Sequence, residues 1–224
     1  MIVDVITVTC GRDFYLKKSL ISLSKHKDRI HHIMILNACE VSKEILDILN
    51  YTGSTILIQE QRISIGECLN KYKKLFKSDL VLKLDDDAII QSDNFFEHAI
   101  EVHKHYPEAV FSPFPVGLIN NFGGPQAVAR EVIYSESSDT YYTLREVKHV
   151  GGFARFTPLS IYNEVNFGEA VHSEDSELSK WCGLNGKKMF YLDNALIVEH
   201  SESTLGQMAR DKSYFSRTRD WMKK

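Results

Sequence analysis

Long apolar runs are missing from the sequence, and no stretch approaches the ~20 residues that a membrane-spanning helix needs. The first residues, MIVDVITVTCGRDF, place Asp4 inside an apolar run and carry no basic segment before it, so they do not resemble a signal peptide. The four cysteines lie far apart and form no C-x-x-C pair, which disfavours zinc binding. We therefore expect a cytoplasmic protein with reduced, mostly buried thiols and no transmembrane segment.

The sequence also lacks a strong excess of charge of one sign. Its 224 residues carry a formal net charge of −3, which excludes a global basic field that would collect nucleic acid or anionic lipid. Basic residues do gather in segment 204–224, which has helical propensity and contains Tyr214, Phe215 and Trp221. This tail either contacts DNA phosphates or an anionic membrane surface, or forms a surface helix whose aromatic residues pack on the core.

Strands and helices alternate along the first half of the chain. Apolar, β-branched runs predict strands at 3–8, 31–36, 55–58, 80–84 and 109–114. Apolar residues at helical spacing predict helices at about 14–23, 42–50, 65–76 and 93–105. This alternation is typical of βαβ units and of a mainly parallel sheet, in which ligands bind beyond the carboxyl ends of the strands.

The second half of the chain has a less regular pattern. Residues 115–140 are rich in turn-forming residues and predict loops, and residues 141–148 alternate weakly, as a strand at a sheet edge does. Further elements are predicted as helices at 158–165 and 173–184 and as short strands at 189–192 and 195–198. We therefore predict a single α/β domain.

Three adjacent acids, Asp85, Asp86 and Asp87, end the strand predicted at 80–84. Burying three carboxylates without partners is unfavourable, so the fold needs something that offsets their repulsion. An Asp-x-Asp sequence places two side chains on the same side of an extended backbone, where they can share one Mg²⁺ or Mn²⁺ with phosphate oxygens. The alternatives are a ribose contact, a nucleophile or base, and a solvated acidic turn. An EF-hand is excluded because its twelfth position, counted from Asp85, is Phe96.

Two more polar sites lie in the last third of the chain. Glu174 and Asp175 come just inside a predicted helix, after Ser173 as a possible N-cap. They either complement the helix dipole or supply a general base that faces a pocket. His200 follows a short apolar strand and is either structural or a further ligand of a hard-cation site.

Taken in order, these features resemble glycosyltransferase family 2, whose members have the GT-A fold. The resemblance is carried by VDVITVTCGRDFYLKKSLISL, ISIGECLNKYKKLFKSDLVLKLDDDAII and HSEDSELSKWCGLNGKKMFYLDNALIVEH. These segments are similar to the opening strand and helix of the family, to the Gly/Asn helix before its Asp-x-Asp strand, and to its Glu-Asp helix with the closing strand and terminal His. The resemblance implies a nucleotide-binding half at 1–112, an acceptor-binding half at 113–203 and a basic helical tail at 204–224.

The resemblance also implies an activity: metal-dependent, inverting transfer of a sugar from a nucleotide-sugar of UDP or GDP type to an acceptor hydroxyl, with a glycan as the expected acceptor. Asp85 and Asp87 would bind Mn²⁺ or Mg²⁺ with His200 as a third ligand. Asp175 would be the general base, with Glu174 as the second candidate. The residues implied to line the nucleotide-sugar site are Thr9, Arg12, Asn37 (or Glu40 in its place), Gly66, Asn70, Asp85, Asp86, Gly151 and Gly152.

Three other interpretations stay open at this point. The same transfer could be made onto hydroxymethylated bases of DNA, with the basic tail in contact with the duplex. A haloacid-dehalogenase-like phosphatase also uses an Asp-x-Asp sequence, although its motif normally closes the first strand of the domain rather than the fourth. The third interpretation is a module that binds nucleotide-sugars without catalysis.

Overall fold

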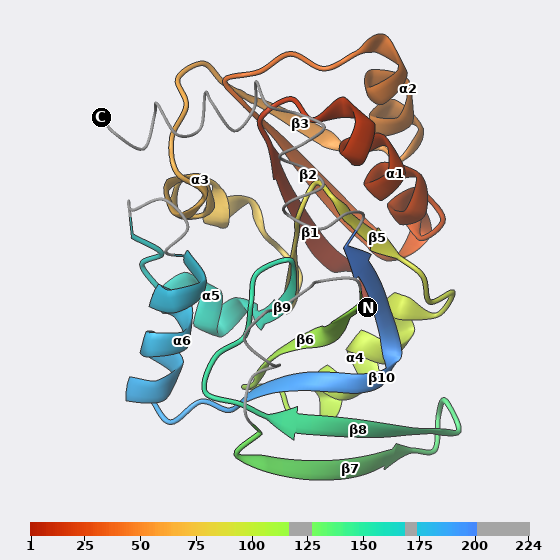
Figure 1. Ribbon diagram of the computed structural model, residues 1–224, viewed down its shortest axis with the longest axis vertical. Coiled ribbons are helices and arrows are strands. Elements are labelled where there is room, and N and C mark those ends of the chain that lie inside the picture. The colour runs from red at the N-terminus through yellow and green to blue at the C-terminus, as the bar shows by residue number, and fades with distance from the viewer. Residues whose placement is uncertain (117–126, 169–173, 201–224) are drawn as a thin grey trace.

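The first half of the chain alternates between strands and helices, beginning with a buried strand. The computed structural model describes residues 1–116, 127–168 and 174–200 (Figure 1). The strands of the first half are β1 (Val3–Thr9), β2 (Ile30–Asn37), β3 (Thr55–Gln59) and β4 (Leu80–Leu84). The connecting helices are α1 (Asp13–Ser24), α2 (Lys43–Tyr51) and α3 (Ile65–Tyr72), with the 3-10 turns η1 (Lys27–Arg29) and η2 (Lys73–Leu75).

In the second half of the chain, strands and helices no longer alternate regularly. Its strands are β5 (Ala88–Ile90), β6 (Val110–Val116), β7 (Ala129–Ser135), β8 (Thr140–Glu146), β9 (Ala154–Pro158) and β10 (Met189–His200). Its helices are α4 (Phe95–His105), α5 (Leu159–Glu164) and α6 (Glu174–Leu184).

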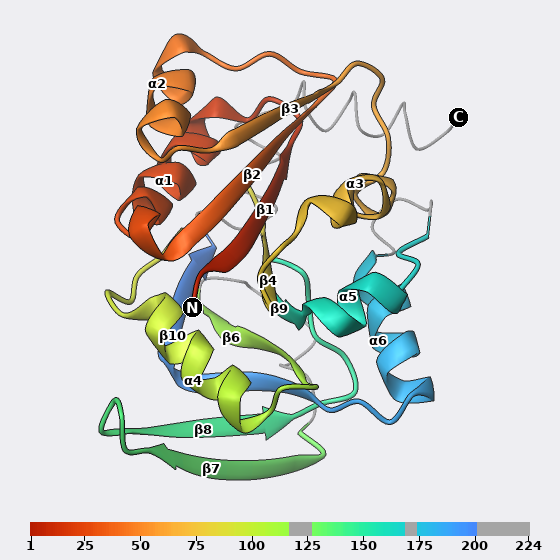
Figure 2. The same ribbon diagram turned by 180° about the vertical axis from the view of Figure 1, so that it is seen from behind.

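All these strands join one sheet. The order is β3-β2-β1-β4-β9-β6-β10-β8-β7, and β5 pairs with β10 outside this path. Strands β3, β2, β1 and β4 run parallel, so their carboxyl ends meet at one edge, whereas β9 runs antiparallel to both β4 and β6. Helices α1 and α2 lie on one side of the sheet, and α3, α5 and α6 on the other (Figures 1 and 2). The predicted α/β class is confirmed.

The apolar runs in the sequence explain why the central strands are buried. Strands covered on both faces carry near-continuous apolar runs, and all five residues of β4 are buried. On the side of α1 and α2, a separate apolar cluster joins both helices to β2 through Leu16, Leu20, Met34, Leu36, Ile45 and Leu49. Helix α3 begins with a capping box, in which the Glu67 N–H donates to Ser64 Oγ and the Ser64 N–H donates to the Glu67 carboxylate.

Asp4, the acid inside the first apolar run, is fully buried in β1. Its Oδ2 accepts hydrogen bonds from the backbone N–H groups of Lys77 (2.6 Å) and Ser78 (2.7 Å). Its Oδ1 lies 2.8 Å from Nδ1 of His31. Asp4 therefore fixes the loop that leads into β4.

Several predicted elements need correction. The region predicted as loops contains β7, a largely exposed strand at the sheet edge, so β8 is not the edge strand that its weak alternation predicted. Strand β9 was missed because Arg155 and Pro158 interrupt its apolar pattern and two glycines precede it. The two short strands predicted after residue 188 form the single strand β10, whose register shifts between Leu192 and Ile197. Strand β5 was also missed.

The sequence predicts mostly buried cysteines and no transmembrane segment. Of the four cysteines, Cys68 and Cys182 are buried, whereas Cys10 and Cys39 are partly exposed. Within the described ranges, no helix combines the length and the apolar character needed to cross a bilayer. The predicted basic tail, 204–224, and the possible cap Ser173 lie outside the described residues.

Candidate active site

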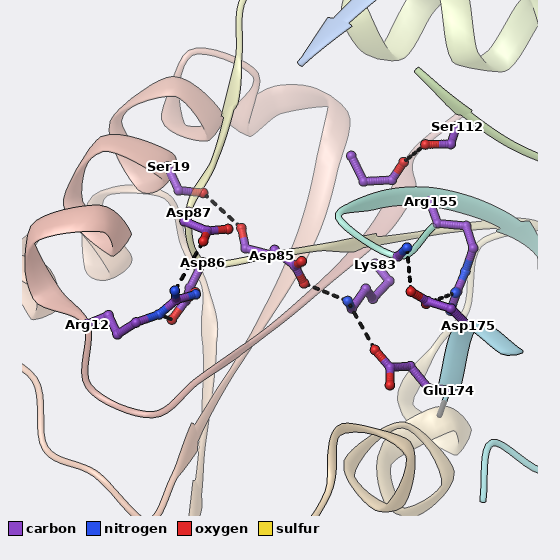
Figure 3. Close-up of polar contacts among 12 residues, drawn as sticks. Arg12, Ser19, Lys83, Asp85, Asp86, Asp87, Ser112, Arg155, Glu174 and Asp175 are labelled. Atoms are coloured by element: carbon purple, nitrogen blue, oxygen red, sulfur yellow. Dashed lines mark hydrogen bonds and ion pairs between the residues drawn. The ribbon is translucent and has the colours of Figure 1, made fainter. Parts of the chain in front are cut away.

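The acidic triplet lies at the edge where the parallel strands end. Asp86 and Asp87 are buried, and the loop after β1 supplies the cation that faces them (Figure 3). Arg12 forms an ion pair with Asp86 and places Nη1 3.1 Å from Oδ2 of Asp87. The Thr9 hydroxyl donates to Oδ2 of Asp86 at 2.7 Å. Burial raises the pKa of Asp86 even though Arg12 opposes this shift.

A second cation meets the first acid of the triplet. Lys83 Nζ lies 2.5 Å from Oδ1 of Asp85. Burial raises the pKa of Asp85 to about 6, because the charge of Lys83 only partly opposes desolvation and the neighbouring Asp87 carboxylate adds repulsion. The carboxyl group of Asp85 is therefore harder to ionise than that of a free aspartate.

Helix α6 brings the second pair of acids to the same region. Glu174 Oε1 lies 3.5 Å from Lys83 Nζ. Asp175 forms an ion pair with the fully buried Arg155, and its Oδ2 accepts from the Gly152 N–H at 2.7 Å. Burial raises the pKa of Asp175, but the charges of Arg155 and Lys83 outweigh it, so this pKa lies below its ordinary value. Asp175 is therefore a carboxylate at neutral pH.

The two acids of α6 differ in their access to solvent. The Asp175 side chain is 26% exposed and the Glu174 side chain only 5%. Oε2 of Glu174 is buried and has no hydrogen-bond partner among the described residues. Asp175 can thus be reached by an incoming molecule without rearrangement, whereas Glu174 cannot.

The predicted glycines fit tightly around these groups. A Cβ on Gly152 would lie 2.1 Å from Oδ1 of Asp175, so only glycine allows this carboxylate its place. The Gly151 N–H donates to the Tyr191 hydroxyl at 2.7 Å. A Cβ on Gly66 would lie 2.4 Å from the carbonyl oxygen of Gly168. The close approach expected at Gly66 is therefore made by the chain's own backbone.

The side-chain amides of Asn37 and Asn70, which are predicted to contact a nucleotide, form hydrogen bonds with the backbone of neighbouring loops. Asn37 is buried, donates to the Ile63 carbonyl at 2.8 Å and accepts from the Ile63 N–H at 3.1 Å. Asn70 accepts from the Phe167 N–H at 3.2 Å and donates to the Asn166 side chain at 2.8 Å. Both residues shape the loops at the strand ends, and their predicted contacts with a nucleotide stay predictions.

His200 is the last residue of β10, and its backbone pairs with Ala88, one residue beyond the acidic triplet. This register brings the end of β10 beside the end of β4, although the two segments are far apart in sequence. The His200 side chain lies outside the described part of the chain. Its role as a metal ligand stays a prediction.

The carboxylate oxygens that meet here are of the kind that bind a divalent cation, although Asp85 faces Lys83 and Asp87 faces Arg12 (Figure 3). Among the described residues, the ion pairs of this region join five carboxylates to three cations; the groups are Asp85, Asp86, Asp87, Glu174, Asp175, Arg12, Lys83 and Arg155. Hard cations prefer carboxylate oxygens. Among the described residues, however, no three His, Cys, Asp or Glu side chains form a metal-binding group, so a cation here would take further ligands from water, from a bound phosphate or from other residues.

Sequence inspection missed two of the residues that organise this site. Lys83 lies inside a strand that is predicted from its apolar residues. Arg155 lies in β9, a strand that the sequence pattern does not predict. The signal for Lys83 was present, because a charged residue inside a run of buried aliphatic residues needs a partner. Arg155 gave no comparable signal, since its burial depends on the pairing of β9 with β4.

The strand order and the position of the acidic triplet define a GT-A fold, which solved structures bear out. S. aureus TarS 1–349 matches with a TM-score of 0.68 and 18% identity over 90% of this chain and 60% of its own. The same protein in complex with UDP-GlcNAc matches with a TM-score of 0.67 and 19% identity over 91% of this chain and 59% of that one.

A third structure agrees with these two. Mannosyltransferase PcManGT from Pyrobaculum calidifontis, in complex with GDP-Man and Mn²⁺, matches with a TM-score of 0.69 and 14% identity over 93% of this chain and 59% of its own. The chain therefore spans about three fifths of these solved chains, and only 37% of a longer TarS chain. No protein-family model matches the sequence, and no curated protein matches it either.

Proposed function

We propose that this protein is a metal-dependent, inverting glycosyltransferase that moves a sugar from a UDP- or GDP-type nucleotide-sugar to an acceptor hydroxyl, most simply that of a glycan. The observation that carries the proposal is the meeting of two acidic groups, Asp85–Asp87 and Glu174–Asp175, at the carboxyl ends of parallel strands, where Lys83 contacts a carboxylate of each group. Proteins of the same fold have been solved with UDP-GlcNAc and with GDP-Man and Mn²⁺.

Asp85 and Asp87, with His200, would hold Mn²⁺ or Mg²⁺. A bound cation would offset the charge that develops on a leaving diphosphate. The residues proposed to shape or contact the donor site are Thr9, Arg12, Asn37, Gly66, Asn70, Asp85, Asp86, Gly151 and Gly152. Of these, Arg12 and Thr9 fix the orientation of Asp86 and so support the strand end on which the donor would rest.

Asp175 is the proposed general base. It is ionised at neutral pH, partly exposed, and held in one orientation by Arg155 and the Gly152 N–H. A base of this kind must come within ~3 Å of the acceptor hydroxyl whose proton it takes. Glu174 is the second candidate, although its burial makes direct contact with an acceptor less favourable. A single displacement inverts the anomeric centre and needs no nucleophilic side chain.

The alternatives differ in how well they fit. A haloacid-dehalogenase-like phosphatase would place its motif after the first strand, whereas Asp85 follows β4. A modified base of DNA as acceptor would depend on the basic tail, of which the described residues form no part. Binding without catalysis is separated from catalysis by the experiment below. We also propose that residues 1–112 bind the donor and residues 113–203 the acceptor.

A thermal-unfolding screen of nucleotide-sugars with and without Mn²⁺ tests the donor side. We expect UDP- or GDP-sugars to raise the unfolding temperature only when Mn²⁺ is present. The released nucleotide and the anomeric configuration of the product, followed by NMR, then test transfer and inversion. Stabilisation without any turnover would leave a binding module, and turnover of a generic aryl phosphate with none of a nucleotide-sugar would favour a phosphatase.

The base assignment is tested with Asp175→Asn. This variant keeps the shape of the side chain and removes its charge, so turnover should fall at least about 100-fold. Glu177→Gln, in the same first turn of α6, is the matched control and should turn over at the wild-type rate. Wild-type turnover by Asp175→Asn would exclude Asp175 as the base.

A further inference from the structure

Lys83 is a buried cation in the middle of an apolar strand. Every residue of β4 is buried, and Lys83 is 4% exposed. Removing a lysine from water in this way is unfavourable unless carboxylates take up its charge in good geometry. The carboxylates of Asp85 and Glu174 lie against its Nζ and supply the opposite charge.

The two carboxylates that neutralise Lys83 come from different parts of the chain. Nζ lies 2.5 Å from Oδ1 of Asp85 and 3.5 Å from Oε1 of Glu174. Asp85 begins the acidic triplet at the end of β4, and Glu174 is the first residue of α6. The ammonium lies between the two carboxylates (Figure 3). A single side chain therefore joins the proposed donor site to the helix that carries the proposed base.

A second cation reinforces this joint from the neighbouring strand. Arg155 of β9 is paired directly with Lys83 in the antiparallel register, which places both side chains on the same face of the sheet. Arg155 holds Asp175, while Lys83 holds Glu174. The first two residues of α6 are thus each anchored to the sheet by their own cation.

We propose that Lys83 is a positioning residue that fixes the separation between the donor-metal site and the base. The proposal rests on the function proposed above and adds a residue that acts through its neighbours. The ammonium orients the Asp85 carboxylate on one side and anchors the start of α6, next to Asp175, on the other. No bond is made or broken at Lys83 in this role.

The test separates positioning from simple charge balance. Lys83→Met leaves Glu174 buried without a counter-ion and should lower the unfolding temperature by about 10 °C. Adding Glu174→Gln removes that unpaired charge and should restore at least half of the loss, since the partly exposed Asp85 can be solvated. Lys83→Met with Glu177→Gln is the matched control and should show no such rescue. Lys83→Arg keeps the charge and should restore both stability and turnover in part.

Turnover measurements then test whether Lys83 affects the transfer reaction itself. At saturating donor and Mn²⁺, the double variant Lys83→Met/Glu174→Gln should transfer sugar about 100-fold more slowly than Glu174→Gln alone, with little change in KM for the donor. Equal turnover of these two variants overturns the positioning role. Absence of rescue by Glu174→Gln overturns the link between the two sites. A wild-type protein that transfers no sugar overturns the proposed function and the catalytic role of Lys83 with it, and the rescue experiment still reports whether the link exists.

Discussion

The carboxylate of Asp175 occupies the space that any side chain at Gly152 would need. Oδ2 accepts the Gly152 N–H at 2.7 Å, and a Cβ at this glycine would lie 2.1 Å from Oδ1 and 2.7 Å from the carboxylate carbon. The backbone of the segment before β9 therefore sets the position of the proposed base as firmly as its ion pair with Arg155 does.

Gly152→Ala should displace this carboxylate. The new methyl group cannot share the space, so Asp175 must turn away and lose the backbone hydrogen bond. A displacement of about 1 Å near reacting atoms lowers turnover by about 100-fold, and we expect this loss with the far-UV circular dichroism unchanged. Gly183→Ala, where a Cβ meets nothing within 4 Å, is the control and should stabilise α6 by up to about 1 kcal/mol. Equal turnover of the two alanine variants would contradict this account.

Asp85→Asn should separate stability from function. Burial, with repulsion from Asp87, raises the pKa of Asp85 to about 6, so its ionised form is less favourable in the folded protein than in the unfolded chain. Removing this charge at pH 7 relieves the unfavourable carboxylate but also takes from Lys83 the nearer of its two carboxylate partners, Glu174 being the other. These effects oppose each other, so the unfolding temperature should change little, while the stabilisation by nucleotide-sugar with Mn²⁺ disappears. The exposed Asp47→Asn is the control and should keep the Mn²⁺-dependent stabilisation. A marked loss of stability in Asp85→Asn would show that the charge is structural.

The sequence predicts the first half of this fold well and the second half poorly, for a physical reason. Parallel strands covered on both faces are marked by their own aliphatic residues, as in β1 and β4, so local pattern suffices to find them. Strand β9 carries Arg155 and gains its burial only by pairing with β4 and β6. Strand β7 is mostly exposed, so its pattern contains little apolar signal.

In the candidate site too, some residues could be predicted from the sequence and others could not. The acidic triplet and the Glu-Asp pair could be found by sequence because adjacent carboxylates are conspicuous wherever they occur. Their counter-ions could not be matched to them, since Arg12 meets Asp86 and Lys83 meets Glu174 only through the topology of the sheet. Asn37 shows what a strand-end position alone does not reveal: its amide hydrogen-bonds to the backbone of Ile63, while its predicted contact with a nucleotide stays a prediction.

Asp4→Ala should destabilise the fold without touching the candidate site. The variant leaves the N–H groups of Lys77 and Ser78 without their buried acceptor, which costs about 3 kcal/mol of unfolding free energy. Asp4→Asn retains one acceptor oxygen and should lose about half as much. Urea denaturation at pH 7 measures both, with the exposed Asp28→Ala as the control that should differ little from wild type. Similar losses in Asp4→Ala and Asp28→Ala would exclude the anchoring role.

His32 should make stability depend on pH in the acidic range. It is buried in β2, with Nδ1 2.8 Å from the Ser54 hydroxyl and Nε2 3.3 Å from the Thr7 hydroxyl, and burial lowers its pKa from 6.5 to about 3. Between pH 6.5 and 3 the unfolded chain binds a proton at this residue and the folded protein does not. Stability is therefore fully present above pH 6.5 and falls as the pH drops through this window, by about 1.4 kcal/mol per pH unit from this group.

His32→Gln removes the titrating group and keeps a side chain that can hydrogen-bond to Ser54. Urea denaturation at pH 7, 6, 5 and 4 should give the variant a shallower decline in unfolding free energy than wild type, whatever its absolute stability at pH 7. His105→Gln, at an exposed position near the end of α4, is the matched control and should follow the wild-type slope. Parallel pH profiles for wild type and His32→Gln would mean that His32 is protonated in the folded state well above pH 3, and that the two hydroxyl contacts do not hold the neutral ring.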